Sequence, residues 1–155
     1  KMKSIKIVFM GASNAGKTSI IQKLVHSTFE RNEATVGVSL EQMVLDQFQI
    51  QIWDTAGQEK YADLAPMYYR NADLIFIVFE VLDRQSFTKA KQLVADLKFD
   101  STAKLVVLAN KCDQEQRSVM TMEIDGYSAQ NDLKIYEVSA ITTSQQRFRE
   151  IVIES

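Results

Sequence analysis

Short apolar runs alternate along the chain with segments in which apolar residues recur at every third or fourth position. Runs typical of buried parallel strands lie at residues 5–10, 74–79, 104–109 and 134–138. Helical spacing occupies roughly residues 17–26, 62–72, 86–98, 122–131 and 143–153. Residues 38–46 and 48–54 instead show the pattern of a two-stranded ribbon. This order predicts an α/β fold whose six-stranded mixed sheet has five parallel strands, one antiparallel edge strand and helices on both faces.

The second strand of the ribbon has two different faces. Phe48, Ile50 and Ile52 share one face, and we expect them to point into the core. Trp53 lies on the other face, together with glutamines, and is expected to be partly exposed. Either a helix or loop covers Trp53, or it anchors a partner protein, because tryptophan is enriched among interface hot spots.

The segment at residues 11–18, Gly-Ala-Ser-Asn-Ala-Gly-Lys-Thr, fits the phosphate-binding pattern G-x-x-x-x-G-K-[ST]. It lies between a predicted strand and a predicted helix, where backbone N–H groups and the helix N-terminus attract phosphate oxygens. Lys17 is expected to reach the β- and γ-phosphates and to assist catalysis, and the Thr18 hydroxyl is expected to bind Mg²⁺. The residues expected to contact a nucleotide here are Ser13, Asn14, Ala15, Gly16, Lys17, Thr18 and Ser19.

A second segment, Asp54-Thr55-Ala56-Gly57-Gln58, begins at the carboxyl end of the second ribbon strand, the edge where doubly wound sheets bind ligands. Asp54 is expected to hold the metal through its water shell, and Gly57 offers a backbone N–H to the γ-phosphate. Gln58 can both donate to and accept from an attacking water, so it is the predicted catalytic residue. Thr35 is the candidate for a second metal-binding oxygen.

A third segment, Asn110-Lys111-Cys112-Asp113, follows an apolar strand. The Asp113 carboxylate can accept hydrogen bonds from N1–H and N2–H₂ of guanine, whereas adenine offers no such pair of donors. This pairing favours GTP over ATP. The stem of Lys111 can lie along the base, and the backbone N–H groups of Ser139, Ala140 and Ile141 are expected to complete the base site.

Composition restricts the remaining possibilities. The chain has 155 residues, a net charge of −2 and one cysteine, Cys112, so we expect neither an internal disulfide nor attraction to nucleic acid. No apolar run approaches the length of a membrane span. We expect residues 1–155 to form a single domain in the cytoplasm.

These motifs together make the chain resemble the Ras superfamily of small GTPases, and the Rab family most closely, over nearly all of residues 3–153. Residues 53–61, Trp-Asp-Thr-Ala-Gly-Gln-Glu-Lys-Tyr, and 68–72, Tyr-Tyr-Arg-Asn-Ala, are similar to Rab signature stretches. Residues 64–70, Leu-Ala-Pro-Met-Tyr-Tyr-Arg, and 86–91, Ser-Phe-Thr-Lys-Ala-Lys, are most similar to the early-endosomal branch.

The resemblance implies a small G domain of the P-loop NTPase class that lacks the family's C-terminal tail, and a GDP/GTP switch acting in vesicle traffic. It implies mobile segments at roughly 29–38 and 57–68, and Phe29 against the guanine edge. Exchange factors, GTPase-activating proteins and effectors are the implied partners, the effectors through Leu40, Trp53, Tyr68 and the switch segments. Peripheral association with endosomal or vesicle membranes is implied only if a lipidated tail is present.

The chain departs from the family pattern at several positions. The segment between Phe29 and Thr35 is one residue shorter than usual, Leu40 replaces an aromatic residue, Asn71 replaces glycine and Ile141 replaces lysine. Two alternatives therefore stay open: a guanine-nucleotide-binding module with negligible hydrolysis, and a scaffold domain that has lost nucleotide exchange.

Base selection by Asp113 is open to a direct test. Asp113→Asn should relax the preference for GTP toward xanthosine triphosphate, because the new amide presents a donor to the changed base edge. Competition between the two nucleotides for the purified variant measures this preference. Unchanged selectivity for GTP would contradict the assignment of residues 110–113.

Overall fold

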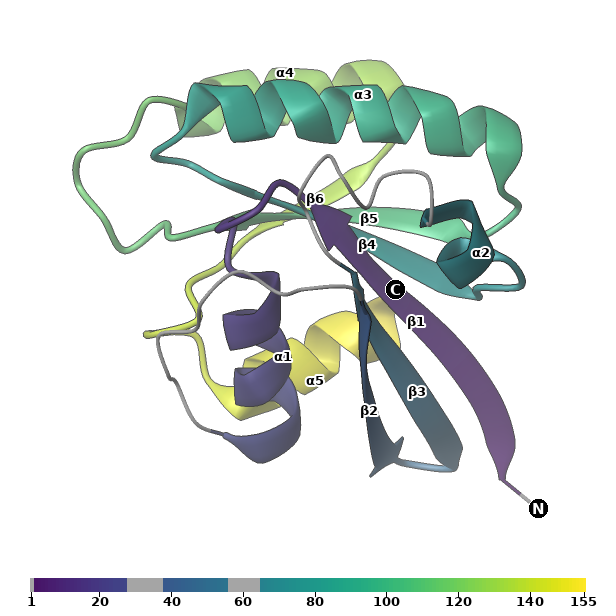
Figure 1. Ribbon diagram of the computed structural model, residues 1–155. Helices are drawn as coiled ribbons and strands as arrows, with labels where there is room; N and C mark the ends of the chain where they lie inside the picture. Colours follow the sequence, from purple (N-terminus) through teal and green to yellow (C-terminus); the bar gives the residue numbers. More distant parts are fainter. Residues whose placement is uncertain (1, 28–37, 56–64) are drawn as a thin grey trace.

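The computed structural model describes residues 2–27, 38–55 and 65–155. Its strands are β1 (Lys3–Gly11), β2 (Val38–Leu45), β3 (Phe48–Thr55), β4 (Leu74–Glu80), β5 (Lys104–Asn110) and β6 (Lys134–Glu137). Within the described residues they form a single six-stranded sheet in the order β2-β3-β1-β4-β5-β6 (Figure 1). β2 is antiparallel to β3, and every other pair of neighbours is parallel. The predicted mixed sheet with one antiparallel edge strand is confirmed.

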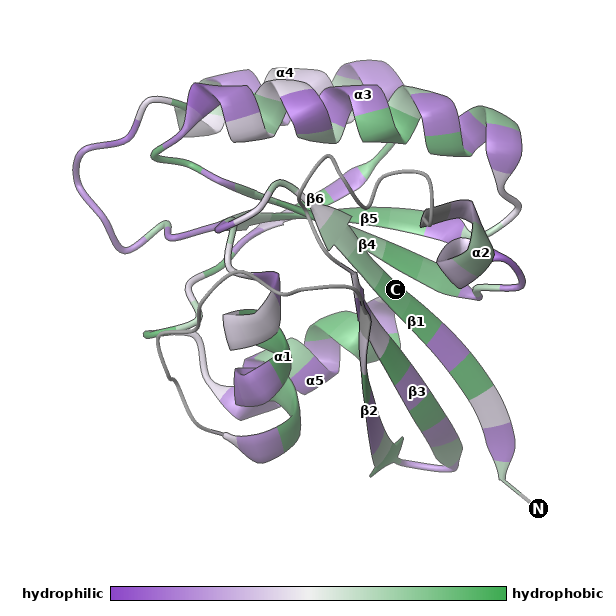
Figure 2. Cartoon of the chain, in the orientation of Figure 1, coloured by the Kyte–Doolittle hydropathy of each residue, from purple (hydrophilic) through white to green (hydrophobic). Residues whose placement is uncertain are grey.

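Helices cover both faces of the sheet. Those of the described residues are α1 (Lys17–His26), α2 (Ala65–Tyr69), α3 (Arg84–Asp100), α4 (Thr121–Asn131) and α5 (Gln145–Glu154). α1 and α5 pack on one face, and α2, α3 and α4 pack on the other (Figure 1). Figure 2 shows β4 and β5 hydrophobic except at their ends, whereas α3 carries both hydrophobic and hydrophilic residues.

The strand runs are continuous because both faces of the sheet are buried. In β1, Ile7 and Phe9 point into the core beneath α1 and α5, whereas Val8 and Met10 point into the core beneath α3 and α4. All four side chains are buried. Burial of apolar surface on two sides of one sheet contributes most of the free energy that holds the layers together.

Two details differ from the sequence expectations. Phe48 was expected in the core but is 39% exposed, because it is the first residue of β3 and pairs with Leu45 beside the hairpin turn at the end of the sheet. The helix expected at 62–72 is observed only at Ala65–Tyr69, and its residues 62–64 lie outside the described ranges. Asn71 follows that helix with φ +62°, a left-handed conformation that asparagine tolerates well.

Helix α3 offers a matched pair of phenylalanines. Phe87 is buried, with its ring centroid 4.7 Å from Phe79 and 5.7 Å from Tyr127, whereas Phe99 is 93% exposed. Phe87→Ala should lower the free energy of unfolding by about 3–5 kcal/mol, and Phe99→Ala should change it by less than about 0.5 kcal/mol. Urea denaturation at constant m-value measures both. Similar losses for the two variants would contradict this description of the core.

Candidate nucleotide-binding site

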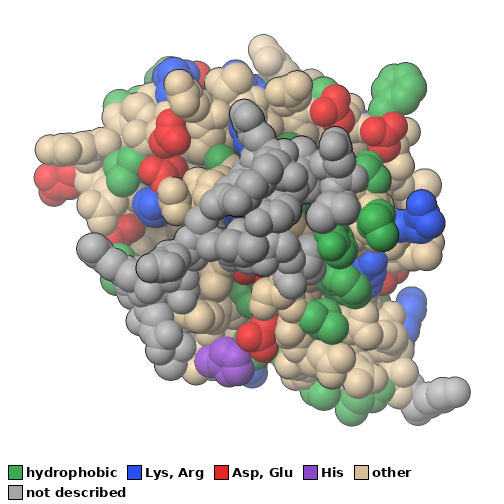
Figure 3. All heavy atoms as spheres, viewed as in Figure 1, with side chains coloured by type: hydrophobic (Ala, Val, Ile, Leu, Met, Phe, Trp, Pro, Cys, Tyr) green, Lys and Arg blue, Asp and Glu red, His purple; other side chains and the backbone are tan. Residues whose placement is uncertain are grey.

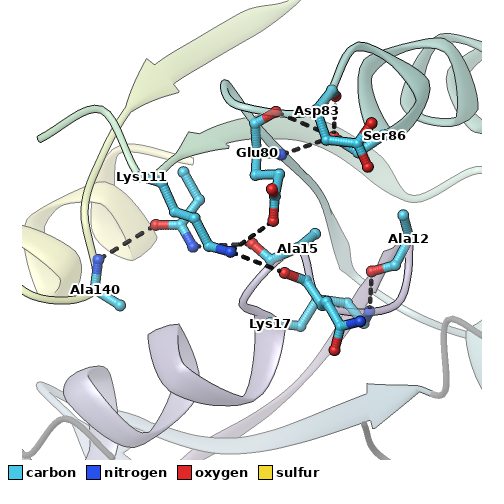
Figure 4. Close-up of polar contacts among 10 residues, drawn as sticks. Ala12, Ala15, Lys17, Glu80, Asp83, Ser86, Lys111 and Ala140 are labelled. Atoms are coloured by element: carbon cyan, nitrogen blue, oxygen red, sulfur yellow. Dashed lines mark hydrogen bonds and ion pairs between the residues drawn. The ribbon is translucent and has the colours of Figure 1, made fainter. Parts of the chain in front are cut away.

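The carboxyl ends of four strands place the three sequence motifs at one edge of the sheet. Phe9 pairs with Asp54, Gly11 pairs with Val78, and Glu80 pairs with Asn110. The phosphate-binding pattern, Asp54 and the segment that starts at Asn110 therefore meet, although they are separated by tens of residues in the sequence. Figure 4 shows the residues that join the first and third of these segments.

The loop between β1 and α1 has a backbone that requires its glycines. Gly11 has φ +145° and Gly16 has φ +97°, values that side chains disfavour. A Cβ at Gly11 would lie 2.1 Å from the carbonyl oxygen of Val78, and one at Gly16 would lie 2.2 Å from Nδ2 of Asn110. Asn14 between them is also left-handed, with φ +66°. The loop therefore packs directly against β4 and β5.

Lys17 begins α1, and its side chain is buried beneath this loop. Its Nζ donates to the carbonyl oxygens of Gly11, at 3.1 Å, and of Ala12, at 2.9 Å. Burial lowers the pKa of the Lys17 ammonium to about 8, although the nearby Asp54 carboxylate acts to raise it. A phosphate oxygen is a charged acceptor and would bind this ammonium more strongly than a carbonyl does.

Thr18 and Asp54, the two described residues predicted to bind the metal, contact each other. The Thr18 hydroxyl donates to Oδ2 of Asp54, which is buried at the end of β3. A hydroxyl and a carboxylate at one point are hard oxygen donors that fit Mg²⁺, an ion that usually keeps several waters and takes further oxygens from phosphates. In residues 2–27, 38–55 and 65–155, no group of three or more His, Cys, Asp or Glu side chains could hold a metal.

Asn110 links two loops through its side chain, which is only 1% exposed. Its Nδ2 donates to the carbonyl oxygen of Ala15 at 2.9 Å, and its Oδ1 accepts from the backbone N–H of Ala140 at 3.2 Å (Figure 4). The Ser139 hydroxyl in turn accepts from the backbone N–H of Ile141 at 3.1 Å. The expected base-site residues are therefore brought beside the phosphate-binding loop, but their three backbone N–H groups, which were expected to bind the base, already donate to side-chain oxygens of the protein.

Lys111 and Asp113 differ in their surroundings. Nζ of Lys111 lies 2.6 Å from Oε2 of Glu80 and 3.2 Å from the carbonyl oxygen of Asn14 (Figure 4). The Asp113 side chain is exposed and accepts from Nε2 of Gln114 at 3.0 Å. Its carboxylate is thus accessible to a ligand, whereas the ammonium of Lys111 is held by the protein itself.

The structure describes only some of the remaining predicted site residues. Phe29, Thr35, Gly57 and Gln58 lie outside the described residues, so their predicted roles stay predictions. Ser13 and Ser19 are partly buried, in the loop and in the first turn of α1. The sequence analysis did not identify Glu80 as a site residue, although Glu80 directly follows the apolar run at 74–79. The signal was a charged residue directly after a buried strand, at the edge where ligands bind.

The predicted effector residues lie close together. Leu40 pairs directly with Trp53 across β2 and β3, so their side chains share a face, and the rings of Trp53 and Tyr68 are 6.0 Å apart. Leu40 and Met67 are exposed, and Figure 3 shows hydrophobic side chains gathered on part of this face.

Among the described helices, none is long and apolar enough to cross a membrane.

The chain is similar to known proteins over most of its length. A model described as the Ras family matches residues 6–154. The GTP-binding protein ypt5 of Schizosaccharomyces pombe is 35% identical over 147 residues, which cover 88% of this chain and 70% of that protein. A putative ras-related protein Rab-5B of Dictyostelium discoideum is 34% identical over 159 residues, 98% of this chain and 73% of that protein. The ras-related protein Rab5A of Oryza sativa subsp. japonica is 35% identical over 150 residues, 92% of this chain and 74% of that protein.

The close contact between Gly16 and Asn110 predicts the effect of adding a single methyl group. Gly16→Ala should lower the free energy of unfolding by at least about 1 kcal/mol, because of its positive φ, and should weaken GDP binding by displacing the Asn110 amide. Gly126→Ala is the matched control: its Cβ would meet nothing within 4 Å, and alanine should stabilise α4 by about 0.5–1 kcal/mol. Urea denaturation and GDP titration of both variants test this. A Gly16→Ala variant with unchanged free energy of unfolding and unchanged GDP affinity would contradict the packing described.

Proposed function

The chain belongs to the Ras family, and on this premise we propose that it is a guanine-nucleotide switch that hydrolyses GTP to GDP slowly. One observation carries the proposal: the buried Lys17 and the Thr18–Asp54 pair lie at the same sheet edge as the Asn110 loop. A phosphate-binding loop alone would fit many nucleotides. Its attachment to a segment that ends in the exposed Asp113 supports guanine recognition.

Each part of the nucleotide has proposed contacts. The loop from Ser13 to Ser19 surrounds the phosphates, Asp113 reads the guanine edge, and the 139–141 loop lies beside the base. The backbone N–H groups of that loop already donate within the protein, so any of them that binds the base must exchange its partner. Thr18 and Asp54 would hold Mg²⁺ together with Thr35. The ion, when bound, neutralises charge on the phosphate oxygens.

Hydrolysis is proposed to depend on two residues with different tasks. Lys17 stabilises charge that develops on the phosphates, and Gln58 orients the attacking water. Arg31 is the only arginine inside the nucleotide motifs and the segments 29–38 and 57–68 of the sequence. An arginine supplied by an activating protein is typically worth about 10³–10⁵ in rate. We therefore propose slow turnover by the chain alone and acceleration by a partner.

We also propose a role in vesicle or endosomal membrane traffic, which the similarity to proteins named Rab5A and Rab-5B supports. Effectors would bind the surface of Leu40, Trp53 and Tyr68, where a large aromatic pair lies beside an exposed leucine. Aromatic side chains of this kind contribute strongly to protein interfaces. An exchange factor and a GTPase-activating protein would complete the switch.

A second candidate is a guanine-nucleotide-binding module with negligible hydrolysis. The observation that favours it is the short sequence between Phe29 and Thr35, which places a predicted metal ligand on a shorter segment than usual for the family. This candidate predicts tight nucleotide binding without turnover, so kinetics separate it from the switch.

Two measurements test the proposed function. Mass spectrometry of nucleotide released from the purified protein should find GDP or GTP. Single-turnover phosphate release from protein loaded with GTP should then be measurable in the wild type and much slower in Gln58→Leu, which keeps the size but removes the water-orienting amide. Gln47→Leu, in the exposed β2–β3 turn, should release phosphate at the wild-type rate.

The outcomes of this test distinguish the candidates. Equal release by the wild type and Gln58→Leu would show that Gln58 does not position the water. Release at the level of protein-free buffer, with tight binding of guanine nucleotide, would support the non-hydrolysing module. Absence of any bound or exchangeable guanine nucleotide would refute both.

A further inference from the structure

Glu80 is a charged residue at the site edge that the proposed mechanism does not use. It ends β4 directly beside Asn110 of β5, and its side chain is 15% exposed. A carboxylate that is largely buried requires a charged or hydrogen-bonding partner, because burial removes its hydration. The partner of Glu80 therefore indicates what the residue does.

That partner is Lys111, whose ammonium lies 2.6 Å from Oε2 of Glu80. The same ammonium donates to the carbonyl oxygen of Asn14 at 3.2 Å. Lys111 and Asn14 both have left-handed backbones, with φ +64° and +66°, a conformation that most residues avoid. One ammonium thus ties together two left-handed backbone turns, one in the phosphate-binding loop and one in the base-site segment.

Glu80 is itself held in place from α3. The buried Ser86 hydroxyl accepts from the backbone N–H of Glu80 at 3.0 Å and lies 2.7 Å from the carbonyl oxygen of Asp83 and 3.1 Å from that of Glu80 (Figure 4). The backbone N–H of Asp83 also donates to the carbonyl oxygen of Glu80 at 3.2 Å. These bonds fix the end of β4, so the Glu80 carboxylate is a rigid anchor for Lys111.

We propose that Glu80 is a positioning residue that prolongs the lifetime of bound nucleotide by holding Lys111 across the phosphate-binding loop. The proposal rests on the proposed function only in assuming that this site binds guanine nucleotide. Glu80 acts through Lys111 and needs no contact with the ligand. Without the ion pair, its negative charge would repel phosphates, so the direction of the mutational effect distinguishes positioning from plain charge repulsion.

The rate at which a fluorescent N-methylanthraniloyl GDP leaves the protein, chased by excess GDP, tests the proposal. Glu80→Gln should accelerate release about tenfold, since one charge-assisted hydrogen bond is lost and tenfold corresponds to about 1.4 kcal/mol. Glu80→Asp keeps the charge and should accelerate release less. Glu123→Gln is the matched control, because Glu123 pairs with Arg84 at 2.8 Å outside the site, and it should leave the rate unchanged.

A double-mutant cycle with Lys111→Met separates positioning from general destabilisation. Glu80→Gln should not accelerate release in the Lys111→Met background, because the residue through which it acts is gone and the only remaining effect is the removal of a charge that repels phosphates. Unchanged or slower release from Glu80→Gln in the otherwise wild-type protein would overturn the proposal. An equal acceleration by Glu80→Gln in the wild-type and Lys111→Met backgrounds would also overturn it. A wild type that binds GDP while Glu80→Gln has no effect would overturn this inference alone. A wild type that binds no guanine nucleotide would overturn the proposed function as well.

Discussion

Burial of the Asn110 amide is the constraint on which the geometry of the site depends. An unsatisfied polar group in the interior costs about 1–3 kcal/mol, so this side chain must find partners away from water. It finds them at the carbonyl oxygen of Ala15 and the backbone N–H of Ala140, in two loops that are distant in the sequence. One side chain on β5 therefore fixes both loops, and the space it occupies leaves no room for a Cβ at Gly16.

Charges of both signs meet at this edge, and each makes hydrogen bonds within the protein. Lys17 is bound by two loop carbonyls, Asp54 accepts from Thr18, and Glu80 pairs with Lys111. The two lysines thus differ in whether a ligand can displace their present hydrogen-bond partners. A phosphate oxygen can replace the neutral carbonyls at Lys17, because it is charged and a stronger acceptor. Lys111 is already paired with a charged carboxylate, so a phosphate oxygen offers it no stronger acceptor. Lys17 would therefore change partners on binding, and Lys111 would keep its own.

The sequence predicted those features that depend on local pattern. Buried runs and helical spacing predicted the mixed sheet, and the motifs predicted the family, which the match over residues 6–154 confirms. Exposure of Phe48 could not be predicted from alternation, because it depends on where the covering layer ends. The pairing of Glu80 with Lys111 was missed for a related reason. It follows from the register that puts Glu80 beside Asn110, a long-range relation that no spacing in the sequence encodes.

Asn110 and Lys111 each bind the phosphate-binding loop, and their side chains differ in exposure to solvent. This difference indicates where the site opens. The Asn110 side chain is buried, whereas that of Lys111 is 36% exposed. Local opening begins where contacts are least protected from water. Loss of the Lys111 contact removes its hydrogen bond to the carbonyl oxygen of Asn14, while Asn110 still holds Ala15. The loop can relax at one point and stay anchored at the next, so a ligand can leave while the sheet and both cores remain intact.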